Sequence, residues 1–196
     1  MILQNDIKAL ALETIQSPRS AAQKIMGLNL SRDVLWTGMA LVAAINAILY
    51  SFSIFFADTT GLPALFSNPI LFYVVVTGIL VVSVHVFHWT GHAMGGRGDM
   101  GGLLALFVWL QALRAVAQGV MFFLLLLAPV LGQLFSFGIG VLGLWITINF
   151  ITEAQNRQSL SHGVGVLVLS AVGIVIGLMI LVGLISVASM GVPANV

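Results

Sequence analysis

Residues 69–93 read PILFYVVVTGILVVSVHVFHWTGHA and contain no Lys, Arg, Asp or Glu. A helix rises 1.5 Å per residue, so about 20 such residues cross the roughly 30 Å of hydrocarbon in a bilayer. Four further apolar stretches are long enough to do the same, at 34–57, 103–129, 133–153 and 163–189. Because every backbone polar group needs an internal partner in lipid, the sequence predicts five transmembrane helices.

The composition of the chain is that of a membrane protein. Its 196 residues are 60% hydrophobic and 7% charged, against about 25% charged in an average soluble domain. A soluble protein of this length cannot hide so much apolar surface from water. The formal net charge of +1 does not indicate a nucleic-acid partner, and without cysteine there are no disulfides or thiolate ligands. We predict an all-α polytopic membrane protein whose first partner is the lipid bilayer, with no cofactor.

Basic residues outside the five stretches indicate the orientation of the chain. Four of them precede the first stretch, Arg97 lies between the second and third, and Arg157 lies between the fourth and fifth. Cytoplasmic loops retain Lys and Arg, so the N-terminus and these two loops are predicted to be cytoplasmic, with the C-terminus across the membrane. The predicted organisation is a cytoplasmic segment 1–33, a membrane domain 34–189 and a tail 190–196.

A short amphipathic helix is predicted within the N-terminal segment. Ser17 followed by Pro18 is typical of an N-cap and a first helical residue, and the helix should run to about Gly27. Its apolar positions, among them Ala22 and Ile25, face away from the polar ones. Two arrangements fit this pattern equally: the helix lies in the cytoplasmic membrane interface, or its apolar face packs against the ends of the transmembrane helices.

The segment GRGDMG at 96–101 matches the dinucleotide-binding pattern G-x-G-x-x-G. That motif requires a preceding strand, a following helix and an acidic residue about 20 positions further on. Here the preceding element is a predicted span, and the residues 20 positions on lie inside another. We therefore interpret the five glycines within 95–102 as a tight hairpin that lets two helix ends approach closely.

Polar residues within the spans gather toward the predicted cytoplasmic side. They form stripes on three helices, and their spacings of i, i+3, i+7 or i, i+4 place each stripe on one helix face. The second span contributes His85, His88 and His92, the third Gln111, Arg114 and Gln118, and the fourth Asn149 and Glu153. Since lipid disfavours exposed polar groups, we expect the three stripes to face one another.

Arg114 is a basic residue inside a predicted span. An unpaired Arg at such a depth costs at least about 2.5–3.5 kcal/mol, and Glu153 is the acidic residue placed to compensate it. We therefore expect Arg114 and Glu153 to be linked, directly or through Asn149 or water. The cluster has two interpretations: a buried network that fixes helix register, or a site for an ion, a proton, a lipid headgroup or a metal.

Among the ligands considered for the polar cluster, a metal ion has the weakest support. The candidate ligands are His85, His88, His92 and Glu153, which have suitable chemistry for zinc or iron. The three histidines are, however, spread along one helix axis, so we predict no metal site. Neither a nucleophile–base pair nor a phosphate loop is visible, and the sequence favours a protein that is not an enzyme.

Small residues mark the predicted packing surfaces. Gly173 and Gly177 in the fifth span form a small-xxx-small pair, which lets helix backbones come into contact. The helix that they meet is predicted to belong either to the same chain or to another protein or second copy. The spacing alone does not choose between these.

The glycine-rich loop carries a family resemblance. Residues 91–99, GHAMGGRGD, lead into the aromatic-rich start of the third span at 103–111. Together with the five spans and the Ser-Pro-Arg helix, this stretch resembles the Yip (Ypt/Rab-interacting protein) family, most closely its bacterial members, over most of residues 17–189. The resemblance implies the five-span fold, the orientation and a membrane-organising role, and it implies no catalytic residue.

Eukaryotic members of that family carry an Asp-Leu-Tyr-Gly-Pro motif and engage prenylated small GTPases. The motif does not occur in this sequence, so the resemblance does not extend to GTPase binding. We predict a non-enzymatic protein of the bacterial inner membrane, a scaffold or accessory subunit that binds lipid, another membrane protein or a second copy. The alternative is a small transporter or an ion- or proton-conducting protein that uses the Arg114/Glu153/His cluster.

Overall fold

Helices make up the fold that the structure describes. The computed structural model describes residues 4–55 and 68–190, and within these ranges it contains helices and no strand. Five of the helices are long and apolar enough to cross a membrane. The prediction of an all-α protein with five transmembrane helices is therefore confirmed at the level of length and composition.

The bounds of the long helices follow the predicted spans closely. They are α3 (Arg32–Phe55), α5 (Pro69–Ala93), α6 (Met100–Leu127), α7 (Pro129–Ala154) and α8 (Leu160–Met190). Four of the five begin between two and four residues earlier than predicted. At α6 the Asp99 carboxylate accepts a hydrogen bond from the Gly102 N–H at 2.8 Å, so the glycines after it join the helix. Positions 56–57 of the first predicted span and 191–196 of the tail lie outside the described residues.

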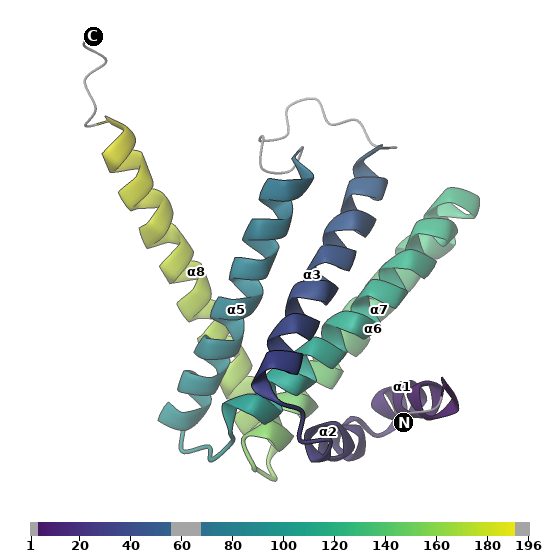
Figure 1. Cartoon of the computed structure of the whole chain (residues 1–196), viewed down its shortest axis with the longest axis vertical. Helices are drawn as coiled ribbons and strands as arrows, with labels where there is room; N and C mark the ends of the chain where they lie inside the picture. The colour runs from purple at the N-terminus through teal and green to yellow at the C-terminus, as the bar shows by residue number, and fades with distance from the viewer. Residues whose placement is uncertain (1–3, 56–67, 191–196) are drawn as a thin grey trace.

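Helices α6 and α7 form an antiparallel hairpin that breaks at the expected proline. Ala128 alone separates them, with an extended backbone (φ −150°, ψ 80°), and Pro129 opens α7. Proline has no N–H and a fixed φ, so it ends one helix and suits the first turn of the next. Gly132 lies so close to α6 that a Cβ atom there would meet the Leu125 side chain at 2.7 Å. The two helices pack along each other (Figure 1).

Two short helices precede the spans, α1 (Gln4–Gln16) and α2 (Pro18–Gly27). Pro18 is the first residue of α2 as predicted, although the Ser17 side chain makes no capping hydrogen bond. The apolar face of α2 is buried, with Ile25 only 3% exposed, and it packs against α6 and α7 (Figure 1). Of the two arrangements left open by the sequence, the structure supports packing against the bundle.

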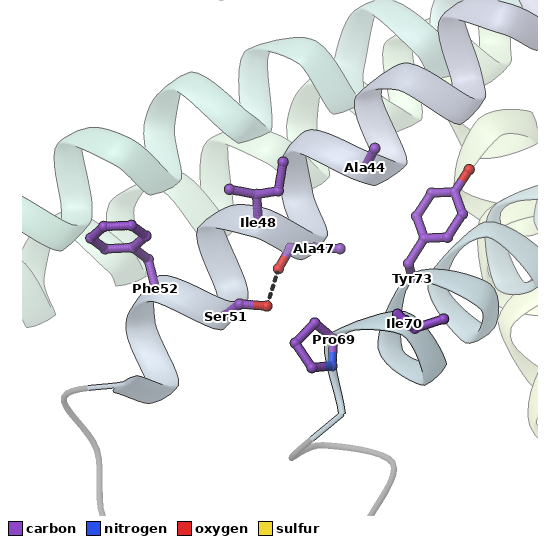
Figure 2. A pocket seen from close by; sticks show the side chains of 8 residues that line it. All are labelled: Ala44, Ala47, Ile48, Ser51, Phe52, Pro69, Ile70 and Tyr73. Carbon is purple, nitrogen blue, oxygen red and sulfur yellow. Dashed lines mark hydrogen bonds between the residues drawn. The ribbon is translucent and has the colours of Figure 1, made fainter.

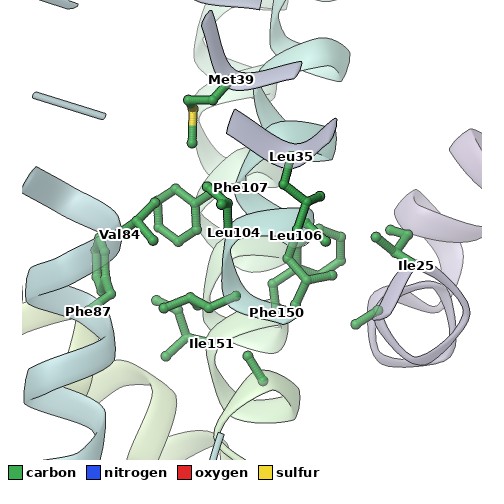
Figure 3. Close-up of a cluster of buried hydrophobic side chains, with 14 of the residues drawn as sticks. Ile25, Leu35, Met39, Val84, Phe87, Leu104, Leu106, Phe107, Phe150 and Ile151 are labelled. Atoms are coloured by element: carbon green, nitrogen blue, oxygen red, sulfur yellow. The ribbon is translucent and has the colours of Figure 1, made fainter. Parts of the chain in front are cut away.

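The hydrophobic core lies near the end of the bundle that α2 covers. Figure 3 shows Ile25 of α2 facing Leu106 and Phe150, while Phe107 and Phe87 meet between α6 and α5 with ring centroids 5.2 Å apart. The long helices pack there in a closed order of neighbours, α3–α5–α8–α7–α6 and back to α3. Lipid is as apolar as these side chains, so shape and polar contacts decide this packing.

The two ends of the bundle differ. We call the end with α2 and the loops 94–99 and 155–159 the basic end, and the opposite end the open end. From the basic end, α5 and α8 diverge from each other and from the remaining helices (Figure 1). At the open end, α8 leaves Val172, Ile176 and Met179 at least half exposed. Polar and close backbone contacts are therefore concentrated at the basic end.

Candidate functional site

The two loops at the basic end are bound to each other. The Arg97 backbone N–H donates to the Gln155 carbonyl oxygen at 3.1 Å. In return, the Arg157 guanidinium donates to the carbonyl oxygens of Gly95 at 2.5 Å and Met94 at 3.5 Å. The connection between α5 and α6 is thus joined to the connection between α7 and α8, some sixty residues further along the chain.

Glycines make this approach possible. A Cβ atom at Gly98 would collide with the Ala154 carbonyl group, and one at Gly91 or Gly96 would collide with the Gln155 side chain. Gln155 is itself 1% exposed, enclosed between the two loops. The glycine-rich segment therefore serves close packing against Ala154 and Gln155, a partner that the sequence did not predict. The element before it is a helix where the dinucleotide motif needs a strand.

Helix α2 is fixed to the same end by hydrogen bonds over long sequence distances. Gln23 Nε2 donates to Glu153 Oε1 at 2.8 Å, and the Arg19 guanidinium donates to the Gln158 carbonyl oxygen at 2.8 Å. Neither contact was predicted from the sequence, because the position of α2 relative to the end of α7 and the loop that follows leaves no periodic signal. The N-terminal helices are in consequence part of the membrane bundle and not a loose extension.

Helix α1 is joined to α2 and to α6. The Glu13 carboxylate accepts hydrogen bonds from Lys24 Nζ at 2.7 Å and Ser20 Oγ at 2.6 Å. These donors, Lys24 first, lower the pKa of Glu13 below its usual value. On the other side of α1, Trp109 Nε1 of α6 donates to Thr14 Oγ1 at 3.0 Å. The contact joins α1 to a Trp, a residue type that prefers the headgroup level of a membrane.

The three histidines of α5 serve separate local contacts. His85 Nδ1 lies 2.7 Å from the Val81 carbonyl oxygen, and its ring stacks on Trp36 of α3 with centroids 6.1 Å apart. His92 Nε2 lies 2.8 Å from the Gly98 carbonyl oxygen, and its ring meets His88 edge-on at 4.4 Å. Among the described residues, no three His, Asp or Glu side chains gather as metal ligands would, so His85, His88, His92 and Glu153 do not form one set.

Arg114 and Glu153 form no direct ion pair among the described residues, and a link between them through water stays a prediction. Glu153 accepts from Gln23 instead, and buried Asn149 donates to the Trp145 carbonyl oxygen of its own helix at 2.8 Å. Arg114 is exposed, and no acceptor in the described part of the chain hydrogen-bonds to its guanidinium. Gln118, one turn further along α6, is half-buried and makes no hydrogen bond to Arg114 within the described part of the chain.

The divergence of the helices explains why the stripes do not converge. Arg114 follows Phe107 by seven residues, which puts both on nearly the same face of α6. Phe107 contacts Phe87 of α5, but Arg114 lies about 10 Å further along the axis at 1.5 Å per residue, in the direction in which the bundle opens. Helical periodicity correctly predicts that Arg114 shares the face of α6 that carries Phe107. At the level of Arg114, however, α5 no longer packs against that face.

The two glycines of the predicted pair in α8, Gly173 and Gly177, differ in their surroundings. A Cβ atom at Gly173 would lie 4.0 Å from Val86 Cγ1 of α5, which is ordinary contact distance. At Gly177 an added Cβ would meet nothing within 4 Å in the described part of the chain. Packing within the chain is therefore loose at Gly173, and contact with another protein or a second copy stays a prediction for Gly177.

An apolar groove of about 770 Å³ lies between α3 and α5 at the open end (Figure 2). Its described lining is Ala44, Ala47, Ile48, Ser51, Phe52, Pro69, Ile70 and Tyr73. The Ser51 hydroxyl donates to the Ala47 carbonyl oxygen at 2.8 Å and is satisfied within its own helix. The groove offers hydrocarbon contact and little polar recognition, in contrast to the basic end.

Comparison with known proteins gives one match, to a family. The family model described as the Yip1 domain matches residues 12–185, from the middle of α1 into α8. No curated protein and no solved structure matches the chain significantly. The match covers nearly all of the elements that form the bundle, including the interlocked loops and α2. The chain therefore belongs to the Yip1 domain family, as the glycine-rich loop and the five spans had indicated.

Proposed function

We propose that this Yip1-domain protein is a non-enzymatic membrane organiser that binds lipid, or that serves another membrane protein as an accessory subunit. Arg114 is the observation that carries the proposal. It lies in the middle of a 28-residue apolar helix, it is exposed, and its guanidinium has no acceptor among the described residues. The acceptor that Arg114 needs is then supplied from outside the chain.

The energetics favour an external acceptor. An Arg that faces hydrocarbon without a partner costs at least about 2.5–3.5 kcal/mol. Its planar guanidinium presents five N–H donors, which match the oxygens of a phosphate or a carboxylate in a bidentate arrangement. Lipid phosphates and the acidic side chains of other membrane proteins are the two sources of such oxygens in a bilayer.

The depth of Arg114 favours the lipid phosphate. Arg114 follows Trp109 by five residues, or about 7.5 Å along the axis, and Trp109 is bound to α1 at the proposed headgroup level. Helical side chains point toward the helix N-terminus, here the basic end, and Arg extends its charged head toward the interface while its stem stays in hydrocarbon. An extended Arg114 side chain therefore reaches the phosphates of the leaflet at the basic end.

We further propose that the basic end is cytoplasmic and that the membrane is the bacterial inner membrane. Six of the seven basic residues precede α3 or lie in the two loops of the basic end, or at the first residue of α3. Retention of Lys and Arg on the cytoplasmic side supports this orientation. The anionic lipids of a cytoplasmic leaflet would also supply acceptors for Arg114.

The transporter alternative has less support. It depended on a converging cluster of Arg114, Glu153 and the histidines, whereas only His88 and His92 of this set are in contact among the described residues. His85 and His92 contact backbone carbonyl groups, and Glu153 is occupied by α2. We therefore retain lipid binding as the proposal.

Native mass spectrometry of gently solubilised protein tests the proposal. The wild type should carry stoichiometric anionic phospholipid, and Arg114→Gln should lose it, while Arg32→Gln, which removes an exposed arginine from the basic end, should keep it. A co-purifying membrane protein that Arg114→Gln releases would support the accessory-subunit form instead. Equal lipid binding by wild type and Arg114→Gln, or substrate-dependent flux into proteoliposomes, would contradict the proposal.

A further inference from the structure

A polar cavity of about 270 Å³, open to solvent and lined by exposed residues, lies between the two interlocked loops of the basic end. It is lined by Gly95 and Arg97 from the first loop and by Asn156 and Arg157 from the second. We propose that this cavity binds a phosphoryl group, carried either by a lipid headgroup or by a free phosphate compound. The proposal does not rest on Arg114, which lies on α6 within the span.

The two arginines differ in how they are used. Arg157 is oriented by its hydrogen bonds to the carbonyl oxygens of Gly95 and Met94, but these occupy only some of its five N–H donors. Arg97 has its backbone N–H fixed to Gln155, while its guanidinium has no acceptor in the described part of the chain. One arginine is thus preoriented and the other is available, and both line the same cavity.

The backbone around the cavity is held in a defined shape. Gly95 has a φ of +82° and Asn156 a φ of +53°, both in the left-handed region. Glycine adopts this region freely and Asn is among the few other residues that do so readily. The Asn156 backbone N–H donates to the Glu153 carbonyl oxygen, which leaves its side-chain amide as a further donor at the cavity. The backbone that carries the ligand groups is therefore ordered before a ligand binds.

The electrostatic balance at the cavity favours an anion. Its described lining contains no carboxylate, and the nearest acids in the sequence are used elsewhere, Asp99 as the cap of α6 and Glu153 by Gln23. The C-terminal ends of α5 and α7 each contribute about half a negative charge. Two full positive charges on the lining exceed these two half charges, which favours an anion as the ligand.

The size of the cavity suits the proposed group. Its volume is equivalent to about nine water molecules at roughly 30 Å³ each. A phosphoryl group has several strong acceptor oxygens, which match guanidinium donors from two sides and an amide from a third. A simpler role for Arg157 is to neutralise the negative charge at the C-terminal ends of α5 and α7. That role does not explain why Arg97 lines the same cavity. Arg97 is therefore the residue on which the proposal is tested.

The test measures phosphoryl binding by the full-length protein in detergent and changes one arginine at a time. Inorganic phosphate is titrated by calorimetry, and phosphatidylglycerol, with phosphatidylcholine as the reference lipid, is titrated by native mass spectrometry. Arg97→Gln should weaken binding by about tenfold or more, since a hydrogen bond to a charged group is worth about 1.5–3 kcal/mol. Arg32→Gln removes the same charge from the same end outside the cavity and should leave binding within about twofold.

Two further variants keep the result interpretable. Asn156→Gly retains the positive φ while removing the amide, and it should weaken binding less than Arg97→Gln. Arg157→Gln should weaken binding and also lower the melting temperature, because it breaks the contact between the loops. The Arg97 side chain makes no hydrogen bond within the described part of the chain, so Arg97→Gln should melt at the wild-type temperature. Loss of binding in a variant with that melting temperature cannot be attributed to unfolding.

The outcomes separate the two sources and can overturn the proposal. Arg97-dependent binding of inorganic phosphate identifies a free phosphoryl compound as sufficient, and Arg97-dependent binding of phosphatidylglycerol alone identifies the lipid headgroup. If Arg97→Gln binds like wild type, or if Arg97→Gln and Arg32→Gln lose affinity equally, the cavity is not a phosphoryl site. In either case the Arg114-dependent lipid should be unaffected by Arg97→Gln, so failure here leaves the proposed function standing.

Discussion

At the basic end, two loops and two N-terminal helices join the spans through hydrogen bonds and close backbone contacts, whereas at the open end α3, α5 and α8 expose apolar side chains to their surroundings. A Cβ atom added at Gly98 would collide with the Ala154 backbone at the first end, while one added at Gly140 or Gly177 toward the second would meet nothing within 4 Å in the described structure. The packing of the helices is therefore defined by specific contacts at the basic end and much less so at the open end.

The physics of a bilayer accounts for this difference. Apolar side chains gain little by leaving lipid for one another, so helix pairs need close backbone approach or polar contacts to be defined. The basic end has both, in its glycines and in pairs such as Gln23 with Glu153. The open end has neither to the same degree, which leaves its apolar surface for lipid or for another protein.

The largest expected effect is at Gly98. Gly98→Ala places a methyl group against the Ala154 carbonyl group and should destabilise the protein by about 3 kcal/mol, the upper range for an overpacked site. The melting temperature in detergent measures the loss. Gly140→Ala, where a Cβ meets nothing within 4 Å, should leave the melting temperature unchanged or slightly raise it. Equal losses in the two variants would remove the distinction between the ends.

The docking of α2 should give the next effect. Ile25 is 3% exposed against the bundle, whereas Leu28 just beyond the helix is 43% exposed. Ile25→Ala should cost about 2 kcal/mol, the lower end of the range for a buried Ile, and release α2, so that trypsin cleaves after Lys24 faster than in wild type. Leu28→Ala is the control and should be cleaved at the wild-type rate. Unchanged cleavage of Ile25→Ala would mean that hydrogen bonds, and not apolar packing, hold α2.

A smaller effect is expected for the link between α1 and α2. The pKa of Glu13 is lowered in the folded protein by hydrogen bonds from Lys24 and Ser20. A carboxylate with a lowered folded pKa stabilises the fold above its unfolded pKa of about 4.3 and loses that contribution as the pH falls through the folded value. Glu13→Gln should therefore melt slightly below wild type at pH 7, with the difference vanishing in acid. A difference that persists below the folded pKa would contradict the ion pair.

The smallest effect is the coupling between Arg114 and Glu153. The two side chains do not pair in the structure, so the stability changes of Arg114→Gln and Glu153→Gln should add within about 0.3–0.5 kcal/mol, as for independent sites. Melting temperatures of wild type, both single variants and the double variant complete the cycle. A coupling well above that range would restore the pair that the sequence had suggested.

The spans and the start of α2 were predictable because they depend on local signals. Apolar length and the positions of Pro18 and Pro129 act within a few residues, and the structure places helix ends at both prolines. The family was recognisable from the glycine-rich loop for the same reason. These features need no knowledge of how the helices tilt.

The candidate site was only partly predictable. The spacing of Arg114 relative to Phe107 correctly indicates a shared helix face, but the divergence of α5 from α6 is a property of the whole bundle and has no local signal. The contact of Arg157 with the first loop likewise depends on two loop conformations at once. The glycines at 95–102 did indicate a close approach, although not the partner that they approach.

The most direct test of the account is the effect of anionic lipid on the thermal stability of wild type and Arg114→Gln. A ligand that binds the folded state stabilises it by RT ln(1 + [L]/Kd), so titration of phosphatidylglycerol into detergent-solubilised protein should raise the melting temperature of wild type in a concentration-dependent way. Arg114→Gln should show at most a small part of that rise, and Arg32→Gln should follow wild type. An equal rise in wild type and Arg114→Gln would contradict the claim that Arg114 finds its acceptor in the membrane.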